Sequence, residues 1–182
     1  DYPLTERGLQ QALCIAEILR REKLAAIYSS PALRAVTTAE AIAKPHGLDV
    51  ITDSRLSEMN HGEMEGLSLE DLERRYPGFL HKWMERPADM RIPGGETLRE
   101  VQQRAWRAVE EMAARHRDST IALVSHNLTI ITILCRAAGT SLDEFRSFRQ
   151  SVACINIISF SHGMTPKIIK VNDTSHLSED AI

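Results

Sequence analysis

Three short stretches of the chain combine residue types that could bind a phosphate group or transfer a proton. The first is Ser125-His126-Asn127, which follows the apolar run 121–124 and precedes an apolar segment with helical spacing over 128–138. This pattern predicts a buried strand that ends at His126 and turns directly into a helix. In parallel α/β sheets, ligands bind beyond the carboxyl ends of the strands, and the free N–H groups at the start of a helix favour an anion. His126 could therefore contact a phosphate, or it could cap the helix and pack beneath a loop.

The second stretch, Tyr28 to Arg34, repeats this arrangement. Residues 26–29 fit a short strand, and Pro31 suits the first position of a helix over 31–43. Arg34 would lie one turn into that helix, where its guanidinium group could reach back over the helix N-terminus and hold a phosphate with two parallel hydrogen bonds. The same position also suits an arginine that is solvated or paired with an acid.

The third stretch is the polar, glycine-punctuated loop 55–66, which contains Glu58, His61, Glu63 and Glu65. A carboxyl group in such a loop could donate a proton to the oxygen of a leaving group. Acidic loop residues are more often simply solvated, and the spacing does not select among the three acids. His61 could line the same pocket.

The elements that must position these stretches alternate between helix and strand, which predicts an α/β fold. Periodicity and capping signals predict helices over 6–23, 31–43, the two parts of 67–87 on either side of Pro77-Gly78, 98–112 and 128–138, with Thr5 as the cap of the first helix and Thr97 and Glu100 as a capping box. Strands are predicted over 26–29, 49–52 and 121–124, and a hairpin of 153–160 and 167–171 precedes a polar tail.

Composition narrows the class of protein. The 182 residues fit a single domain over 1–182, and the net charge of −3 with a pI near 6.2 gives no basic footprint for nucleic acid or an anionic membrane. The three cysteines, Cys14, Cys135 and Cys154, each lie in an apolar segment, which is typical of core thiols in a reducing compartment and predicts a cytoplasmic protein. No apolar run approaches the length of a membrane span.

Five segments, in this order and over nearly the whole chain, together resemble the histidine phosphatase superfamily, the phosphoglycerate-mutase-like group. They are Asp1-Tyr-Pro-Leu-Thr-Glu-Arg-Gly8-Leu-Gln-Gln-Ala12, Tyr28-Ser-Ser-Pro-Ala-Leu-Arg34-Ala-Val-Thr-Thr38-Ala, Leu56-Ser-Glu58 with Gly62 and Glu65-Gly66, Pro93-Gly-Gly-Glu96-Thr, and Val124-Ser-His126. The resemblance implies a three-layer sandwich in which helices flank a mostly parallel central sheet. It also implies phosphoryl transfer through a phosphohistidine, with neither metal nor other cofactor.

Carried onto the matching positions, the resemblance gives three residues a role. Arg34 is a phosphate-binding arginine, His126 is the second histidine that holds the phosphate, and Glu58 is the general acid for the leaving alcohol. Such a set suits phosphoryl transfer, which needs mainly positioning and compensation of the charge on the phosphate oxygens. Asn127 stands where many members of the family have glycine, and we expect it to cap the helix, with a polar contact to the phosphate as the alternative.

One part of the family pattern does not occur in the chain. The nucleophilic histidine of the family belongs to an Arg-His-Gly segment on the first strand, and the sequence contains no such tripeptide. The chain opens on Asp1 without a methionine, and we expect the natural protein to carry the segment and its strand upstream. The 182 residues alone should then fold poorly and show no turnover, because a central strand would be lost. The alternative is a relative that binds phosphorylated ligands without catalysis.

Within the family, the interval from Glu58 to His126 is 68 positions, shorter than in the mutases, and it resembles the phosphatase branch. Residues 62–91 would form a lid over a small phosphorylated metabolite. Two other functions remain open at this point: a cofactor-dependent phosphoglycerate mutase, and a metallohydrolase that uses His61, His126 and His176. The apolar C-terminal strands could pair across a homodimer.

Overall fold

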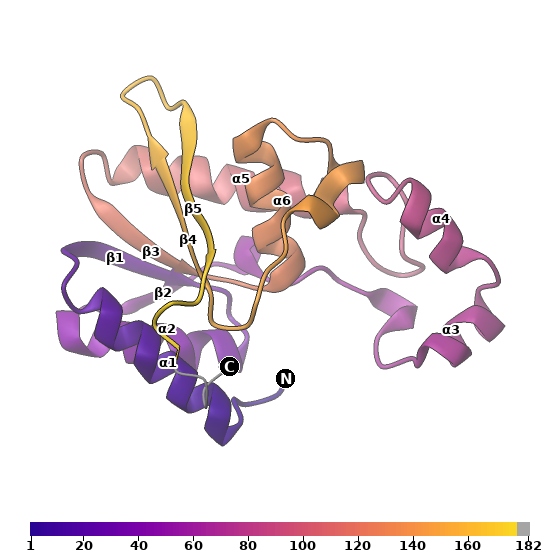
Figure 1. Ribbon diagram of the computed structural model, residues 1–182, viewed down its shortest axis with the longest axis horizontal. Coiled ribbons are helices and arrows are strands. Elements are labelled where there is room, and N and C mark those ends of the chain that lie inside the picture. Colours follow the sequence, from indigo (N-terminus) through magenta and orange to yellow (C-terminus); the bar gives the residue numbers. More distant parts are fainter. Residues whose placement is uncertain (178–182) are drawn as a thin grey trace.

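A parallel three-stranded sheet lies at the centre of the computed structural model, which describes residues 1–177 (Figure 1). Strand β1 (Leu24–Ser29) is the middle strand, between β2 (Val50–Thr52) and β3 (Thr120–Val124). Ser29 at the end of β1 pairs with Thr52 and with Val124. All three strands therefore end at the same edge of the sheet, where a parallel sheet of this class binds its ligands.

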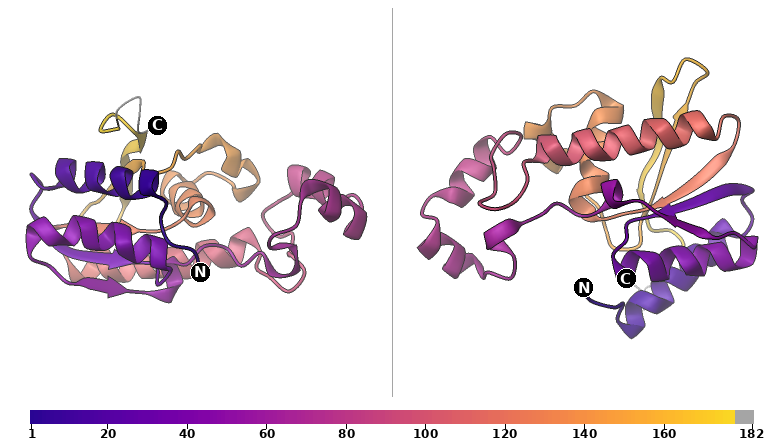
Figure 2. Two further views of the ribbon diagram at one scale, coloured as in Figure 1. Left: turned by 90° about the horizontal axis from the view of Figure 1, so that it is seen from below. Right: turned by 180° about the vertical axis from the view of Figure 1, so that it is seen from behind.

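Helices cover both faces of this sheet. Helices α1 (Glu6–Leu19) and α2 (Leu33–Ala43) lie on one face, and α5 (Leu98–Arg115) and α6 (Asn127–Ala138) lie on the other (Figures 1 and 2). Side chains of β1 alternate between the two sides: Ile27 packs towards α1 and α2, whereas Ala26 and Tyr28 pack towards α5. The three-layer α/β fold with a parallel central sheet is thus confirmed.

Local capping signals correctly predicted two of the helix starts. The Thr5 side chain accepts a hydrogen bond from the backbone N–H of Gly8, and Thr97 and Glu100 form the predicted capping box. Helix α1 ends four residues earlier than predicted. Helix α2 begins at Leu33 rather than at Pro31, because the backbone of Ala32 is still extended.

Two short helices, α3 (Leu69–Arg75) and α4 (Phe79–Glu85), project to one side of the three layers, as Figure 2 shows. They form the region predicted as a lid, and Pro77-Gly78 separates them as predicted. The Tyr76 hydroxyl donates to Glu63 Oε2 at 2.7 Å. Trp83 lies edge-on to Phe145, with 6.2 Å between the ring centroids. The Tyr76 hydroxyl thus joins two parts of the predicted lid to each other, whereas the Trp83–Phe145 contact joins this region to residues 142–147. Short stretches of 3-10 helix connect these elements. Three are single turns, η1 (Lys44–His46), η2 (Ser54–Leu56) and η3 (Gly62–Met64), and the longer η4 (Leu142–Ser147) is kinked at Glu144.

Strands β4 (Ile155–Phe160) and β5 (Pro166–Asp173) form the predicted antiparallel hairpin, and no strand pairing joins it to β3 within residues 1–177. Residues 121–124 of β3 are half-buried rather than buried. The prediction of a buried strand here is wrong because, among residues 1–177, β3 has a neighbouring strand only on its β1 side. The predicted polar tail lies partly outside the described residues.

The cysteines of the described residues are free thiols. Cys135 is buried, while Cys14 and Cys154 are partly buried. Burial raises the pKa of the Cys135 thiol to about 11, so this thiol stays protonated and unreactive near neutral pH. Among residues 1–177 no helix combines the length and the apolar character needed to cross a membrane.

Candidate active site

His126 lies where β3 ends and α6 begins, and it links the ends of two strands. Its imidazole Nε2 is 2.7 Å from Ser30 Oγ, just beyond the end of β1, and its Nδ1 is 3.2 Å from Arg34 Nη2. A guanidinium group can only donate hydrogen bonds, so Nδ1 accepts from Arg34 and the ring proton lies on Nε2, which donates to Ser30. The structure thus brings together the two stretches that the sequence suggested for a phosphate.

Two features of this environment favour the neutral imidazole. Burial lowers the pKa of His126, and the positive charge of Arg34 lowers it further, while Glu58 opposes the shift. His126 is therefore mostly uncharged at neutral pH when no ligand is bound.

Arg34 is the second residue of α2, within its first turn, and its side chain is 41% exposed. Its Nη1 is 3.6 Å from Asp1 Oδ1, and the other oxygen of Asp1 accepts a hydrogen bond from Leu33 N at 2.8 Å. Asp1 thus caps α2, whose own N-cap residue Ala32 has no side chain that can do so. The start of α2 and the guanidinium group of Arg34 both favour a negative charge at this position.

Glu58 lies at the start of α6, beside His126. Its Oε1 accepts from the backbone N–H groups of Met59 at 2.9 Å and Thr129 at 3.2 Å, and its Oε2 accepts from Leu128 N at 3.2 Å. Leu128 and Thr129 are the second and third residues of α6, whose N–H groups a capping side chain normally binds. Glu58 is therefore the acid of this loop that the fold places at the start of α6, next to His126.

The other two acids of the loop point elsewhere. Glu63 binds Tyr76 and forms an ion pair with Arg75 in the lid, and Glu65 is exposed. The tertiary structure thus separates three acids that the spacing alone left equivalent.

Two other residues predicted for the site, Asn127 and His61, form no hydrogen bond with the residues around His126 within residues 1–177. Asn127 is exposed as the first residue of α6, and within residues 1–177 its side chain forms no hydrogen bond. The prediction that Asn127 caps this helix is wrong, because the carboxylate of Glu58 takes that role from a distant loop. The ring of His61 is partly exposed at the start of η3 and forms no hydrogen bond to the site within the same residues.

The histidines considered for a metal do not form a common site. His176 Nε2 lies 2.9 Å from the carbonyl oxygen of Ala153, next to the C-terminal hairpin. Among residues 1–177, no three histidine, cysteine, aspartate or glutamate side chains converge in a way that could hold a metal ion.

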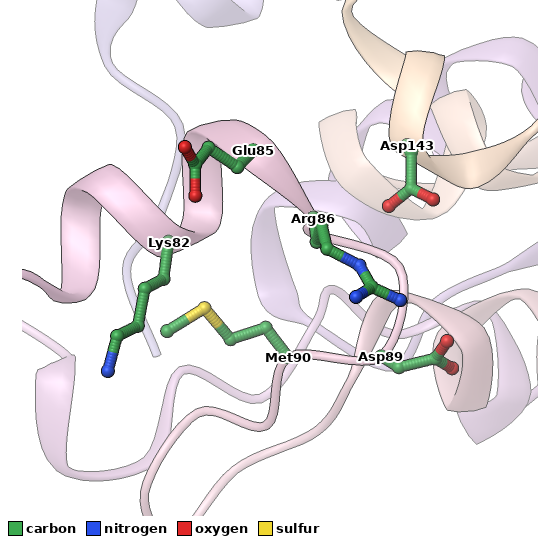
Figure 3. Close-up of a pocket in the computed structure, with 6 residues that line it drawn as sticks. All are labelled: Lys82, Glu85, Arg86, Asp89, Met90 and Asp143. Carbon is green, nitrogen blue, oxygen red and sulfur yellow. The ribbon is translucent and has the colours of Figure 1, made fainter.

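A separate cavity of about 320 Å³ opens between the lid and η4 (Figure 3). Two of its acids already have partners, since Asp143 accepts from Ala88 N and Asp89 pairs with Arg99. The cavity contains none of the residues around His126; it is lined by Lys82, Glu85, Arg86, Asp89, Met90 and Asp143.

Comparison with known proteins now decides the family, because residues 1–174 match the profile of the histidine phosphatase superfamily (branch 1). This chain belongs to that superfamily. It is 36% identical over 179 residues to phosphoserine phosphatase 1 of Hydrogenobacter thermophilus, covering 98% of this chain and 84% of the relative. It is 30% identical over 186 residues to the probable phosphoglycerate mutase GpmB of Salmonella choleraesuis, covering 100% of this chain and 86% of the relative. The solved structure of Bacillus stearothermophilus YhfR is 31% identical, with a TM-score of 0.90 over 97% of this chain and 87% of that chain.

These findings confirm the family and the phosphoglycerate-mutase-like fold that the sequence motifs implied. As a member of the histidine phosphatase superfamily with a relative named as a phosphatase, the protein is a phosphoric monoester hydrolase.

Sequence reasoning did not single out several residues that complete the site of this histidine phosphatase. Ser30 holds the His126 ring, and Thr129 Oγ1 lies 3.3 Å from Glu58 Oε1. Arg104 binds the loop that carries Glu58. For Arg104 a signal existed: it lies on the same helical face as the buried Val101 and Ala108, where an arginine needs an internal partner.

The lowered pKa of His126 predicts how the stability of this histidine phosphatase depends on pH. The unfolded chain protonates this histidine near its ordinary pKa of about 6.5, whereas the folded protein does so only at lower pH. The contribution of neutral His126 to the free energy of unfolding is therefore complete above about pH 6.5. It is lost as the pH falls from there towards the lower pKa of the folded protein. Urea unfolding of the full-length protein between pH 7.5 and 5 should therefore show a smaller loss of stability for His126→Gln than for the natural protein.

The matched control for this measurement is His81→Gln, because the side chain of His81 is 76% exposed on α4. This variant should lose stability with falling pH as the natural protein does. Identical pH profiles for all three proteins would contradict the neutral, buried state of His126.

Proposed function

We propose that this protein hydrolyses small phosphomonoesters through a phosphohistidine intermediate, without a metal ion. The observation that carries the proposal is the convergence of His126, Arg34 and Glu58 at the carboxyl ends of β1 and β3, beside the starts of two helices. The starts of helices α2 and α6, the guanidinium group of Arg34 and the imidazole of His126 thus lie close to one another. That combination compensates the charge of a phosphoryl group as it is transferred.

Each group has a separate task in the proposed reaction. Arg34 leaves Asp1 and binds two oxygen atoms of the phosphate. His126 turns its Nε2–H from Ser30 towards a third oxygen, and the added negative charge favours its protonated form. In its protonated form, Glu58 donates a proton to the oxygen of the departing alcohol. The carboxylate that results then takes a proton from the water that attacks the phosphohistidine, which restores the protonated form.

We place the nucleophilic histidine on a strand that precedes Asp1 in the natural protein. A place for such a strand supports this proposal, because within the described residues β3 pairs with β1 alone and the β4–β5 hairpin pairs with neither. A strand beside the free edge of β3 would end near His126. It would also cover the half-buried residues 121–124.

As substrates we propose phosphomonoesters of amino-acid size, with phosphoserine first, since the relative from Hydrogenobacter thermophilus is named a phosphoserine phosphatase. The lid over 62–91 would enclose such a molecule. The similarity to a probable phosphoglycerate mutase favours one alternative, the interconversion of phosphoglycerates. The two reactions differ in whether inorganic phosphate is released.

The test is a screen of the full-length gene product for phosphate release from phosphoserine, sugar phosphates and phosphoglycerates, with and without a chelator. We expect release of phosphate from at least one small phosphomonoester, unaffected by the chelator. Interconversion of 2- and 3-phosphoglycerate without phosphate release would replace the proposal with a mutase. Binding of phosphate without any turnover would replace it with a non-catalytic ligand-binding role.

Two statements about the protein in the cell are also proposals. We infer a cytoplasmic location, which cell fractionation would test. We infer a homodimer formed by the C-terminal hairpin, in which the apolar side chains of Ile157, Ile169 and Val171 are exposed. A monomer in sedimentation at micromolar concentration would contradict the second.

A further inference from the structure

Arg104, on helix α5, uses all five of its N–H groups in hydrogen bonds inside the protein. Nη1 donates to the carbonyl oxygens of Arg55 and Ser57, each at 2.8 Å, and Nη2 donates to that of Glu58 at 3.1 Å. Nε and Nη2 also bind the two carboxylate oxygens of Glu96 at 2.8 and 2.9 Å. An arginine has five N–H donors in a rigid plane, so this guanidinium group is fully satisfied by one arrangement of its neighbours.

The main chain that Arg104 binds belongs to the loop 55–58, whose last residue carries the candidate acid. The same loop also receives hydrogen bonds from the turn between β3 and α6 and from the first turn of α6. Ser125 Oγ donates to the carbonyl oxygen of Leu56, and Thr129 Oγ1 donates to that of Ser57, both at 2.7 Å. Side chains therefore bind all four consecutive carbonyl groups. Such a loop is fixed by its surroundings rather than by a regular backbone ladder.

Glu96 binds Arg104 and also contacts the main chain on the far side of Glu58. Glu96 Oε2 accepts a hydrogen bond from Asn60 N at 2.9 Å, on the other side of the acid in the sequence. Burial alone would raise the pKa of the Glu96 carboxyl group, but the hydrogen bonds from Arg104 and Asn60 outweigh burial and hold this pKa below its usual range. Glu96 thus stays ionised and keeps the guanidinium group in one orientation.

We propose that Arg104, oriented by Glu96, is a positioning residue that sets the place of the Glu58 carboxyl group at the start of α6. This inference rests on the proposed role of Glu58 as the proton donor. Proton transfer requires the donor within hydrogen-bond distance of the leaving oxygen, and a displacement of about 1 Å can cost about 100-fold in rate. Arg104 itself contacts main-chain atoms of the Glu58 loop, so its effect passes through the position of the acid.

The test compares esters with good and poor leaving groups in the full-length protein. Nitrophenolate is a stable anion and can leave without being protonated. The alkoxide of an alkyl phosphate is a poor leaving group and needs a proton from an acid as it departs. For Arg104→Lys, we expect kcat/KM for an alkyl phosphate to fall about 30-fold, within the range of general acid catalysis, and kcat/KM for 4-nitrophenyl phosphate to fall less than about threefold. The matched control is Arg107→Lys on the same helix, where the side chain is exposed; both rates should stay unchanged.

Glu58→Gln and the double variant separate this inference from the proposed function. We expect Glu58→Gln to show the same selectivity for poor leaving groups, and Arg104→Lys to add little to it. If Glu58→Gln is selective while Arg104→Lys lowers both rates equally or neither, the positioning role is wrong and the role of Glu58 stands. If Glu58→Gln is not selective, both are wrong. Should Arg104→Lys fail to fold, Glu96→Gln replaces it, and the same loss for alkyl phosphates is expected.

Discussion

Replacing Arg34 with lysine is expected to lower kcat/KM by about 10²- to 10³-fold. A loss of this size is typical when one hydrogen-bond donor that stabilises the negative charge of a transition state is removed. Lysine keeps the positive charge but lacks the planar pair of donors that binds two phosphate oxygens together. It also loses the contact of Nη2 with His126 Nδ1. Since we propose that Arg34 binds the phosphoryl group and not the leaving group, the loss should be equal for esters with good and poor leaving groups.

Steady-state kinetics of the full-length protein with 4-nitrophenyl phosphate and an alkyl phosphate would measure this loss. Arg20→Lys is the matched control, because Arg20 is exposed and pairs only with the exposed Glu17 within residues 1–177. A loss below about threefold for Arg34→Lys would remove Arg34 from the phosphate site. A loss confined to the alkyl ester would indicate an influence on proton donation instead.

The meeting of Arg34 and His126 could be predicted from the sequence, because both follow strands of a parallel sheet. Parallel strands all end at the same edge of the sheet, so the residues that follow them lie along that edge. This holds without knowledge of the order of the strands. Helix starts marked by Thr5 and Thr97 were equally predictable, since a cap bonds to N–H groups only two or three residues away.

The position of Glu58 could not be derived from spacing, because a loop without periodicity gives no direction to its side chains. The family resemblance selected it, and the structure shows the contacts that hold it, which come from residues 128–129 and 104. The cap that Asp1 provides to α2 could not be predicted for the same reason, because it depends on a contact between distant residues. Asp1 and its partner Leu33 are 32 positions apart. The half-burial of β3 was also missed, because an apolar run indicates the preferred environment of a strand and not the presence of its neighbours.

The loop that carries Glu58 is also fixed by a close contact between two glycine-containing turns. Glu63 N donates to the carbonyl oxygen of Pro93 at 2.9 Å, and Glu96 N donates to that of Asn60 at 3.0 Å. A Cβ atom on Gly62 would lie 2.2 Å from the Pro93 carbonyl oxygen, and a Cβ atom on Gly95 would lie 2.3 Å from that of Asn60. Glycine is needed here so that the two backbones can pack directly on each other.

Gly62→Ala is therefore expected to destabilise the protein by about 3 kcal/mol or more, because a left-handed backbone and an overlap with main-chain atoms both oppose the added methyl group. The residue has a φ of +49°, and no flexible side chain can move to make room. Gly66→Ala is the matched control: its φ is +77°, but a Cβ atom there meets nothing within 4 Å, so only the left-handed conformation should cost, about 1 kcal/mol. Urea unfolding of both variants measures the difference.

Separation of the two turns would also release Glu96 from Asn60 and so loosen the support of Glu58. The folded fraction of Gly62→Ala should therefore lose activity towards alkyl phosphates more than towards 4-nitrophenyl phosphate, as expected for Arg104→Lys. Equal stability of the two glycine variants would show that the turns can move apart at little cost. The loop would then owe its position to Arg104, Ser125 and Thr129 alone.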